Sequence, residues 1–430
     1  MPKTPTFHKE KLKNGLRFIH VPLETTETVL AMVLVGTGAD YESKAENGLA
    51  HFLEHMCFKG TAKRPNAKGI ALEFDNIGAD YNAFTGRSHT GYYARAHKKH
   101  ASKIIEMVSD IYLNSTFPEA EIEKEKGVII QEINMYMDDP QFRVSRLATV
   151  QLYGDQPAGR EIAGTKETVS SFTRKDIVRY YDDQYSAKNT VVVIAGNIKR
   201  TQAKSQVEKL FKGLNPGKVA KRPITKVNQD KPNVALEFRE TDQTHLILTF
   251  RAMGYLDKRN PAARSLAMAL GSGMSSRLFQ KMREELGICY YINAGLHARH
   301  DVGEFVITAG VANDRVNEAL EGIIDELKNV SKNGIEQAEL EKVKEGRLSS
   351  LVLHLETTED YADFYAKQEI LKGKIELPKD RIKEIEGVTL KSVNTLAKDI
   401  FSPEKANLAV LGPFSESKKK EFMKILSSLS

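Results

Sequence analysis

The chain has 430 residues, of which 41% are hydrophobic and 28% charged, and its net charge of +6 comes from 63 basic and 57 acidic side chains. This composition is typical of a soluble globular protein with two or more domains, and so small and scattered an excess of positive charge predicts no nucleic-acid partner. No apolar run approaches the ~20 residues that span a bilayer, residues 1–14 contain no apolar signal core, and Cys57 and Cys289 predict no disulfide framework, so we expect a cytoplasmic protein without a membrane partner.

The first half of the chain alternates signals for strands and helices. The near-continuous β-prone run Thr28–Val35 predicts a buried strand, and Asn47-Gly48 predicts the start of a helix with Asn47 as its N-cap. The same reasoning predicts further elements: a strand over 12–21 around a turn, a helix over 68–76, paired strands over 78–94, helices over 99–113, 118–137 and 173–180, and a strand over 190–195.

The second half repeats the first. A stretch of prolines among basic and polar residues, 214–233, predicts a linker between domains over 1–213 and 234–430. Three segments then align in order at offsets of 216 to 218 residues: Thr389–Gly412 with Thr173–Gly196, Ala338–Lys342 with Ala120–Lys124, and Leu266–Met268 with Leu49–His51. The sequence therefore predicts two homologous α+β domains, each a mixed sheet packed with helices.

The stretch Gly48–Met56 places two histidines four residues apart with a glutamate between them. On a helix, His51 and His55 share one face and Glu54 lies beside them. Two neutral imidazoles at this spacing are suited to zinc, and a free carboxylate next to them is placed to accept the proton of an attacking water. The order H-x-x-E-H is the signature of the inverzincins.

The repeat supplies an internal control for this motif. The second copy keeps the apolar positions but replaces the three polar residues by Met268, Gly271 and Ser272. The fold itself therefore does not require the polar residues, and we expect a metal site in the N-terminal domain and none in its homologue.

Catalytic zinc usually takes three protein ligands, so a third is expected from outside this helix. In the predicted helix after Pro118, Glu125 and Glu132 fall within an apolar stripe, where a carboxylate is costly unless a cation or hydrogen bonds meet it. The second copy has Val343 and Ser350 at these positions. We predict that Glu132 is the third ligand and Glu125 an outer carboxylate near the metal. The alternative is that Glu132 pairs with a lysine or arginine.

With these motifs in view, the sequence closely resembles the insulinase and pitrilysin family of zinc peptidases. Within that family it is most similar to the half-size branch that includes mitochondrial processing peptidase and its bacterial relatives. The resemblance spans both halves and rests on Gly15-Leu16-Arg17, HFLEHMCFKG at 51–60, Asn82-Ala83-Phe84-Thr85, EKGVIIQE at 125–132, Ser276-Arg277-Leu278-Phe279, Arg283 and Tyr290.

The resemblance implies a zinc-dependent endopeptidase with one zinc ion per chain. It implies that His51, His55 and Glu132 bind the ion, that Glu54 is the general base, and that Glu125 is needed for full activity. The implied substrates are peptides or unfolded segments held within a closed chamber.

The resemblance also implies how substrate is held. Asn82 and Ala83 are expected on a strand edge that binds an extended peptide by β-augmentation. Arg283 and Tyr290 match a pair that contacts substrate and steadies the tetrahedral intermediate, although both could instead be packing residues. In half-size relatives this pair comes from the other chain, because two chains close as the halves of a clamshell. A homodimer is therefore implied, with a heterodimer as the alternative.

One residue departs from the family pattern, and other features bear on whether the chain is catalytic. Ser88 stands where the family often has an acid, which puts any ion pair or substrate contact there in doubt. The stretch 272–277 is short, unlike the long glycine-rich loop of the non-catalytic processing-peptidase partner, so we expect the catalytic type. Cys57, which follows the histidine helix, is expected in the core. The rival hypothesis is a catalytically silent structural or partner subunit of a heteromeric assembly, and the complete polar set counts against it.

Overall fold

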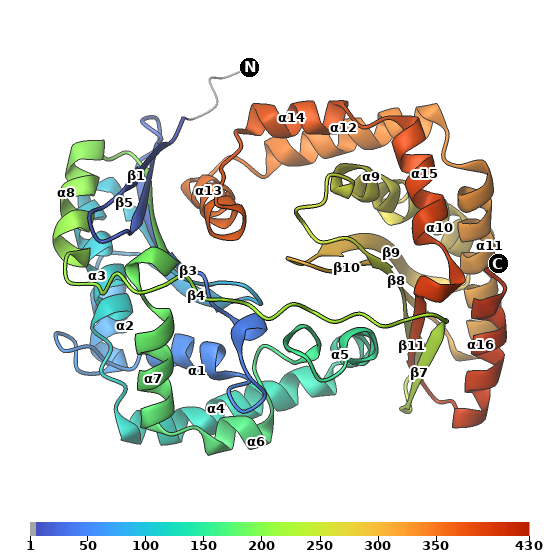
Figure 1. The fold of residues 1–430 in the computed structure, drawn as a ribbon, viewed down its shortest axis with the longest axis horizontal. Coiled ribbons are helices and arrows are strands. Elements are labelled where there is room, and N and C mark those ends of the chain that lie inside the picture. Colours follow the sequence, from blue (N-terminus) through green and yellow to red (C-terminus); the bar gives the residue numbers. More distant parts are fainter. Residues whose placement is uncertain (1–5, 430) are drawn as a thin grey trace. The chain divides into compact units, whose positions relative to one another are not determined.

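The computed structural model describes residues 6–429, which form two compact units. The first unit takes in the chain up to Asn134, Arg160–Pro223 and Val352–Lys379. The second unit takes in Met135–Gly159, Ile224–Leu351 and Asp380–Ser430. Each unit has its own sheet and its own core, and each is described here by itself (Figure 1).

The first unit is built on a six-stranded mixed sheet in the order β1-β2-β6-β3-β5-β4. Its strands are β1 (His8–Lys11), β2 (Arg17–Pro22), β3 (Thr28–Val35), β4 (Asp80–Thr85), β5 (Thr90–His97) and β6 (Thr190–Gly196). β2 and β6 run parallel, and the other neighbours run antiparallel. β3 and β6 are apolar along almost their whole length because helices cover both faces of the sheet at its centre.

Helices cover the two faces of this sheet unequally. One face carries α1 (Leu49–Met56), α2 (Ala67–Asp75), α3 (Ala101–Leu113), α4 (Glu119–Asp138), α6 (Lys166–Ser171), α7 (Arg174–Gln184) and α8 (Arg200–Phe211). The opposite face is covered by one helix from late in the chain, α13 (Thr358–Lys372). Ala362, Tyr365 and Ala366 of α13 are fully buried there against the apolar side chains of β2, β3 and β6.

The second unit is built on a five-stranded mixed sheet in the order β7-β11-β8-β10-β9. Its strands are β7 (Asn233–Phe238), β8 (Gln243–Ala252), β9 (Cys289–Ala298), β10 (Gly303–Ala312) and β11 (Ala406–Gly412). Its helices are α5 (Pro140–Tyr153), α9 (Asn260–Gly271), α10 (Arg277–Phe279), α11 (Val316–Asn333), α12 (Gln337–Leu353), α14 (Pro378–Glu386), α15 (Leu390–Ile400) and α16 (Lys419–Ser427). α5 packs on one face through Val144 and Ala148, and the main core lies on the other face.

The two sheets have the same topology, so the predicted α+β duplication is confirmed. With β7 to β11 taken as the counterparts of β2 to β6, both sheets follow one strand order, and β1 is an addition to the first. The predicted alignments also hold, since α9 and α12 stand where α1 and α4 stand, and α15 and β11 where α7 and β6 stand.

The two compact units differ from the two consecutive halves of the chain because each half contributes one helix to the other unit. α5 and α13 are equivalent in the repeat, and each packs in the unit to which the rest of its half does not belong. We therefore keep, as a proposal, the division into homologous halves over 1–213 and 234–430 with a linker over 214–233. The folded units differ from these halves by one exchanged helix each. The physical reason is that each sheet has a second apolar face to cover, and an amphipathic helix of either half can cover it.

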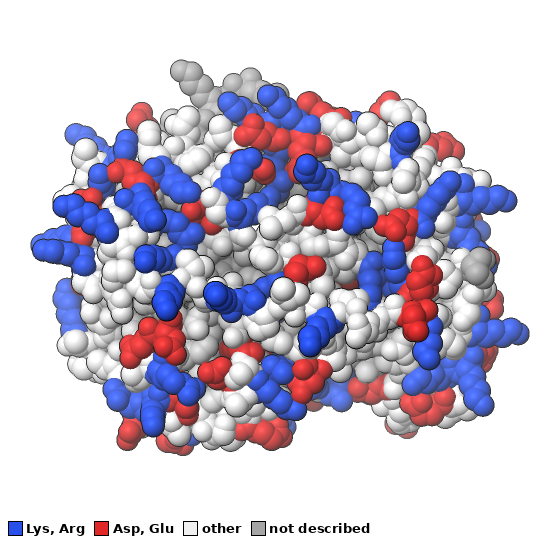
Figure 2. Space-filling model, viewed as in Figure 1, with Lys and Arg blue, Asp and Glu red and all other residues white. Residues whose placement is uncertain are grey.

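Surface and cysteine features agree with the composition. Lys and Arg side chains are intermixed with Asp and Glu over the face shown in Figure 2. Both cysteines are free and buried. Within residues 6–429, no helix combines the length and apolar character needed to cross a membrane.

The exchanged helix leads to a first prediction. Tyr365→Ala is expected to lower the free energy of unfolding of the first unit by about 3–5 kcal/mol, the range for truncating a buried aromatic side chain, because Tyr365 is 0% exposed beneath the sheet. Urea unfolding measures the change. Leu353→Ala, at the 67% exposed last residue of α12, shortly before α13, should change the value by no more than about 0.5 kcal/mol. Equal effects of the two substitutions would contradict the packing role of α13.

Candidate metal centre

Helix α1 holds the two histidines of the motif. Its buried face, Leu49, Phe52, Leu53 and Met56, is 0% exposed within the core of the first unit. Because this face fixes the rotation of the helix, the polar residues of the motif must lie on its remaining sides.

The predicted N-cap of this helix is wrong. The N-cap position is Gly48, which has a φ of 99° and makes no side-chain cap. Asn47 instead contributes a donor, since its Nδ2 donates to the carboxylate of Glu42 at 3.3 Å and to the carbonyl oxygen of Glu161 at 2.8 Å.

Three of the predicted side chains converge on one point in the first unit. Ligand atoms of His51, His55 and Glu132 all lie within 4.8 Å of one another. The Nε2 atoms of His51 and His55 are each 3.7 Å from an oxygen of Glu132, one on each carboxylate oxygen. Since zinc–nitrogen and zinc–oxygen bonds are ~2 Å long, ligands that share one ion lie within ~4 Å of each other. The donor set and its spacing therefore fit zinc.

The protonation of the histidines suits a metal. Burial lowers the pKa of His51 to about 4, with a smaller effect from His55, so the His51 ring is neutral near pH 7 and keeps a lone pair for a cation. Burial would also lower the pKa of His55, but the hydrogen bond to Glu125 and the charges of Glu54, Glu125 and Glu132 raise it overall. A cation at this point would take the place of the proton that these carboxylates attract.

Glu125 lies behind His55 rather than beside the other two ligand candidates. Its carboxylate is 3% exposed and contacts Nδ1 of His55 at 2.7 Å, so this contact orients the ring and leaves Nε2 facing Glu132. The other oxygen of Glu125 pairs with Nζ of Lys59 at 2.6 Å. Despite burial, these two partners hold the pKa of Glu125 below its usual value.

Lys59 is a functional candidate that the sequence reasoning missed. It lies just beyond α1, and its ammonium group balances a carboxylate that would otherwise be buried among the acids of the site. The available signal was its position four residues after His55, within the stretch that carries the resemblance.

Glu54 is separate from the three converging residues and stands between α1 and β4. The hydroxyl of Thr85 on β4 donates to its carboxylate at 2.5 Å. Burial raises the pKa of Glu54, while the Thr85 hydrogen bond lowers it. A carboxylate whose pKa is raised in this way accepts a proton more readily than an exposed one.

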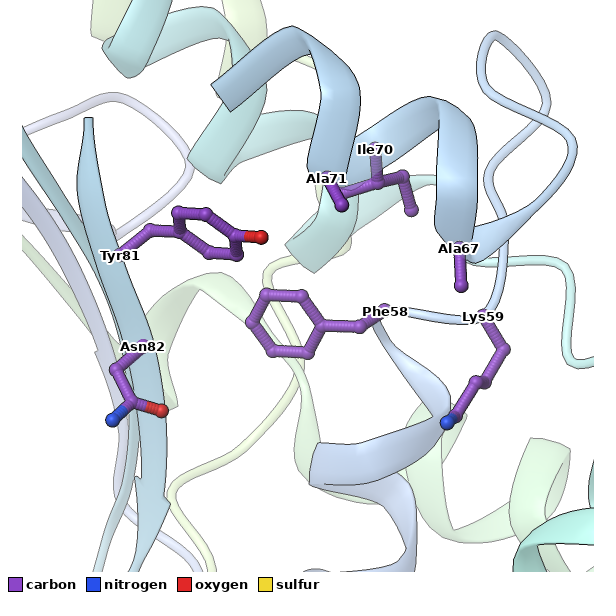
Figure 3. A pocket seen from close by; sticks show the side chains of 7 residues that line it. All are labelled: Phe58, Lys59, Ala67, Ile70, Ala71, Tyr81 and Asn82. Carbon is purple, nitrogen blue, oxygen red and sulfur yellow. The ribbon is translucent and has the colours of Figure 1, made fainter. Parts of the chain in front are cut away.

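The strand next to Glu54 is the edge of the first sheet. β4 pairs with β5 on one side and ends the strand order on the other. Asn82 and Ala83 lie on this strand, as the resemblance implied. Beside it is a pocket of about 310 Å³ between α2, β4 and the segment after α1 (Figure 3). Seven residues line it: Phe58, Lys59, Ala67, Ile70, Ala71, Tyr81 and Asn82.

Arg283 and Tyr290 lie in the second unit. Arg283 belongs to a π-helical turn, Gln280–Glu285, and its guanidinium donates to the main-chain carbonyl of Tyr290. The Tyr290 side chain is 64% exposed at the start of β9. The Arg283 guanidinium also lies 5.5 Å from the ring centroid of Phe279, which packs against the core of the second unit.

The metal-free copy has no room for such a site. Gly271 stands where Glu54 stands, and a Cβ atom there would lie 2.2 Å from the main-chain nitrogen of Ala294 on β9. Helix α9 and its edge strand therefore touch directly, whereas α1 and β4 are separated by the Glu54 and Thr85 side chains. Met268, at the His51 position, packs against Gly346 of α12 instead.

Two further positions singled out from the sequence make contacts outside the converging residues. Cys57 is 0% exposed within the core, and its sulfur contacts the hydroxyl of Tyr92 at 3.4 Å, as expected of a packing residue. Ser88 donates to the buried carboxylate of Asp40 at 3.3 Å. At this position the chain therefore makes a local hydrogen bond to a carboxylate.

The contact between His55 and Glu125 predicts a measurable effect on metal binding. Glu125→Gln is expected to weaken zinc binding by about 10- to 100-fold, the usual result of losing an outer partner of a metal-bound histidine. Competition with a chromophoric chelator measures it. Glu121→Gln, on the same helix but paired with the exposed Lys124, is the matched control and should bind zinc like the parent protein. An unchanged affinity in Glu125→Gln would contradict the orienting role.

Two domains of one peptidase family match successive parts of the chain. Residues 17–166 match the family described as Insulinase (Peptidase family M16), and residues 171–347 match the Peptidase M16 inactive domain. The first match contains the converging residues, and the second contains the copy in which Met268, Gly271 and Ser272 replace the polar motif.

Similar proteins cover almost the whole chain. A protein of Bacillus subtilis named uncharacterized zinc protease YmxG is 36% identical over 405 residues, which are 93% of this chain and 97% of that protein. An uncharacterized zinc protease of Rickettsia bellii is 35% identical over 411 residues, 95% of this chain and 98% of that protein. Among solved structures, a protease from Helicobacter pylori has a TM-score of 0.87 at 23% identity and covers 95% of this chain and 100% of its own, which shows the likeness of fold.

Proposed function

The chain belongs to the insulinase family of peptidases (family M16), and from this premise we propose that it is a zinc-dependent endopeptidase. The observation that carries the proposal is the convergence of His51, His55 and Glu132 within 4.8 Å, with Glu54 held at the neighbouring strand edge. One zinc ion per chain is proposed at this point. When bound, zinc polarises the scissile carbonyl and increases the acidity of water.

Different side chains of the first unit bind the ion, transfer the proton and orient the base. His51, His55 and Glu132 hold the ion. Glu54 accepts the proton of the attacking water and later gives it to the leaving amine, so that its carboxylate is regenerated in each cycle. The Thr85 hydroxyl keeps the Glu54 carboxylate turned toward the edge of β4.

The proposed substrate is an extended peptide or unfolded segment that pairs with β4. An edge strand offers free main-chain donors and acceptors, which bind peptides of many sequences by β-augmentation. Asn82 and Ala83 would line this contact. Phe58, Ile70 and Tyr81 give the adjoining pocket an apolar side, and Lys59 and Asn82 give it a polar one, so we propose that it receives a side chain of the substrate.

We propose that Arg283 and Tyr290 complete the site from a second copy of the chain. Both side chains are exposed, and Arg283 stands on a π-helical turn, a feature often found at functional sites, which supports a role outside the core. The homodimer would enclose its substrates in a chamber, with a heterodimer as the alternative. A silent structural subunit is the less favoured function, because such a subunit has no need of a complete zinc-binding trio.

One measurement tests the central proposal. The purified chain should contain one zinc ion per chain and cleave internally quenched peptides, and a chelator should abolish cleavage until zinc is restored. Absence of stoichiometric zinc, or cleavage that survives removal of the metal, would contradict it. Sizing of the same sample distinguishes homodimer from monomer.

The shared site gives a further expected result. Glu54→Gln chains and chains with both Arg283→Ala and Tyr290→Ala should each be inactive alone. In a statistical mixture, hybrid dimers contain one site with intact residues from both chains, so about a quarter of the parental activity should return. No return of activity, in mixtures shown to exchange subunits, would contradict sites built across two chains.

A further inference from the structure

Glu42 is a buried carboxylate at the start of the metal helix. Its side chain is 1% exposed and accepts from the main-chain N–H of Gly48 at 2.8 Å and of Ala50 at 2.7 Å. The side-chain amide of Asn47 adds a third donor at 3.3 Å. A residue seven positions before α1 thus satisfies N–H groups of the N-cap and the first helical turn that have no partner within the helix.

Helix α1 needs such a partner more than most helices do. It has only eight residues, and isolated helices of this length are marginal in water. Its own N-cap, Gly48, has no side chain, and its φ of 99° is one that other residues rarely adopt. A carboxylate at this end also interacts favourably with the helix dipole.

The opposite side of the same turn is clamped as well. The hydroxyl of Thr168 donates to the carbonyl oxygen of Asn47 at 2.7 Å. A Cβ atom at Gly48 would lie 2.8 Å from the Cα of Gly164, so the two chain segments are in direct contact. With Glu42 on one side and this segment on the other, the main chain entering α1 has a single position.

The rings of His51 and His55 are oriented by different contacts. Nδ1 of His55 contacts Glu125, which orients its ring from behind. Nδ1 of His51 is buried, and no hydrogen-bond partner for it is found in residues 6–429. The orientation of the His51 ring therefore comes from packing and from its main chain, and Ala50, the residue directly before it, is the one whose N–H Glu42 holds at 2.7 Å.

Burying the Glu42 carboxylate costs free energy, and the second copy of the fold has no carboxylate at the equivalent position. Burial raises the pKa of Glu42 to about 7, so its three donors offset only part of the cost of burying the charge. At the 217-residue offset the equivalent residue is Arg259, and α9 begins at Asn260, well before the equivalent of Leu49, Leu266. Only the copy with the metal motif combines a late helix start with a remote capping carboxylate.

We propose that Glu42 is a positioning residue of the metal centre: by fixing the first turn of α1, it sets the position of His51, whose ring has no outer partner of its own. This inference rests on the proposed zinc site. It assigns to Glu42 for His51 the role that Glu125 has for His55, exerted through the main chain instead of through the ring.

The test compares two substitutions of buried carboxylates in the same unit. Glu42→Gln keeps the size of the side chain and removes its charge. Glu369→Gln does the same at a carboxylate that is 2% exposed and pairs with Lys9 at 2.6 Å, in contact with β1 and β2 and not with α1. The zinc dissociation constant of the full chain is measured by chelator competition, together with the midpoint of thermal unfolding and kcat/KM.

Glu42→Gln is expected to raise the zinc dissociation constant by about 10-fold or more, as loss of an outer support of a ligand does. Glu369→Gln should lower the unfolding midpoint but leave the dissociation constant within about 2-fold of the parent, since surface or distant changes leave metal ligands in place. If both variants bind zinc like the parent, Glu42 has a purely structural role and the inference fails.

A second variant and a measurement on the parent chain complete the test. Should Glu42→Gln fail to fold, Asn47→Ala, which removes one donor to Glu42, must weaken zinc binding in the same direction, and an unchanged affinity would overturn the inference. The parent chain is measured first. If it binds no zinc, the proposed function fails, whereas normal zinc binding by the parent and by Glu42→Gln alike refutes the role of Glu42 alone.

Discussion

Replacing Glu54 by glutamine is expected to leave zinc binding intact and to lower kcat/KM by about 10²- to 10⁴-fold, the range that a positioned acid–base group contributes. The amide has the shape of the carboxylate, and its oxygen can still accept the hydrogen bond that Thr85 now donates at 2.5 Å. What the amide cannot do is take a proton from water. The deficit should therefore appear in kcat rather than in substrate affinity.

The Glu54 experiment has a matched control in the same unit. Glu123→Gln removes a carboxylate from α4 that is 71% exposed and points away from the converging residues, so its kcat/KM should equal that of the parent. Quenched-peptide kinetics and zinc content are measured on the same samples. A Glu54→Gln protein with near-parental rates would exclude Glu54 as the base, and one that had lost its zinc would make it a ligand instead.

Removal of a histidine ligand should have the largest effect on the metal itself. His55→Ala is expected to weaken zinc binding by more than the about 100-fold that loss of an outer contact costs, because it removes both a ligand and the partner of Glu125. The variant should be isolated without stoichiometric zinc and without detectable peptidase activity. Elemental analysis and chelator competition measure the first effect, and quenched peptides the second.

The duplication provides the control for this experiment. Ser272→Ala alters the position that corresponds to His55 in the metal-free copy, and it should change neither zinc content nor kcat/KM. If His55→Ala retained one zinc ion per chain at parental affinity, the metal would have to lie elsewhere and the proposed site would be wrong.

Much of the fold was predictable because its signals are local. The apolar run of β3 and the capping box that Thr173 makes with Asp176 at the start of α7 act over a few residues, and the structure has a strand and a helix where the sequence predicts them. The duplication was predictable because it repeats such local signals at a fixed offset. The H-x-x-E-H order also needs only helical periodicity to place His51 and His55 side by side.

What was missed depends on contacts between distant segments. Local sequence favoured Asn47 as the N-cap. In the structure, the carboxylate of Glu42, seven residues before the helix, accepts from the N–H of Gly48, and the amide of Asn47 donates to the same carboxylate. Lys59 follows His55 by four residues, but its pairing with Glu125, 66 positions further along the chain, depends on tertiary packing that this local spacing does not give. The exchange of α5 and α13 was also hidden, since the apolar face of a helix does not reveal which sheet it covers.

The sequence by itself determined the order of elements, the duplication and the identity of the metal-ligand candidates, because periodicity, caps and spacing act within a helix or strand. Only the tertiary structure decided how these residues meet: that Glu132 stands 3.7 Å from both imidazoles, that Glu54 rests on Thr85 of an edge strand, and that Gly271 closes the same place in the second copy. Such distances depend on how helices pack on a sheet, which is set by the shape and burial of many side chains at once.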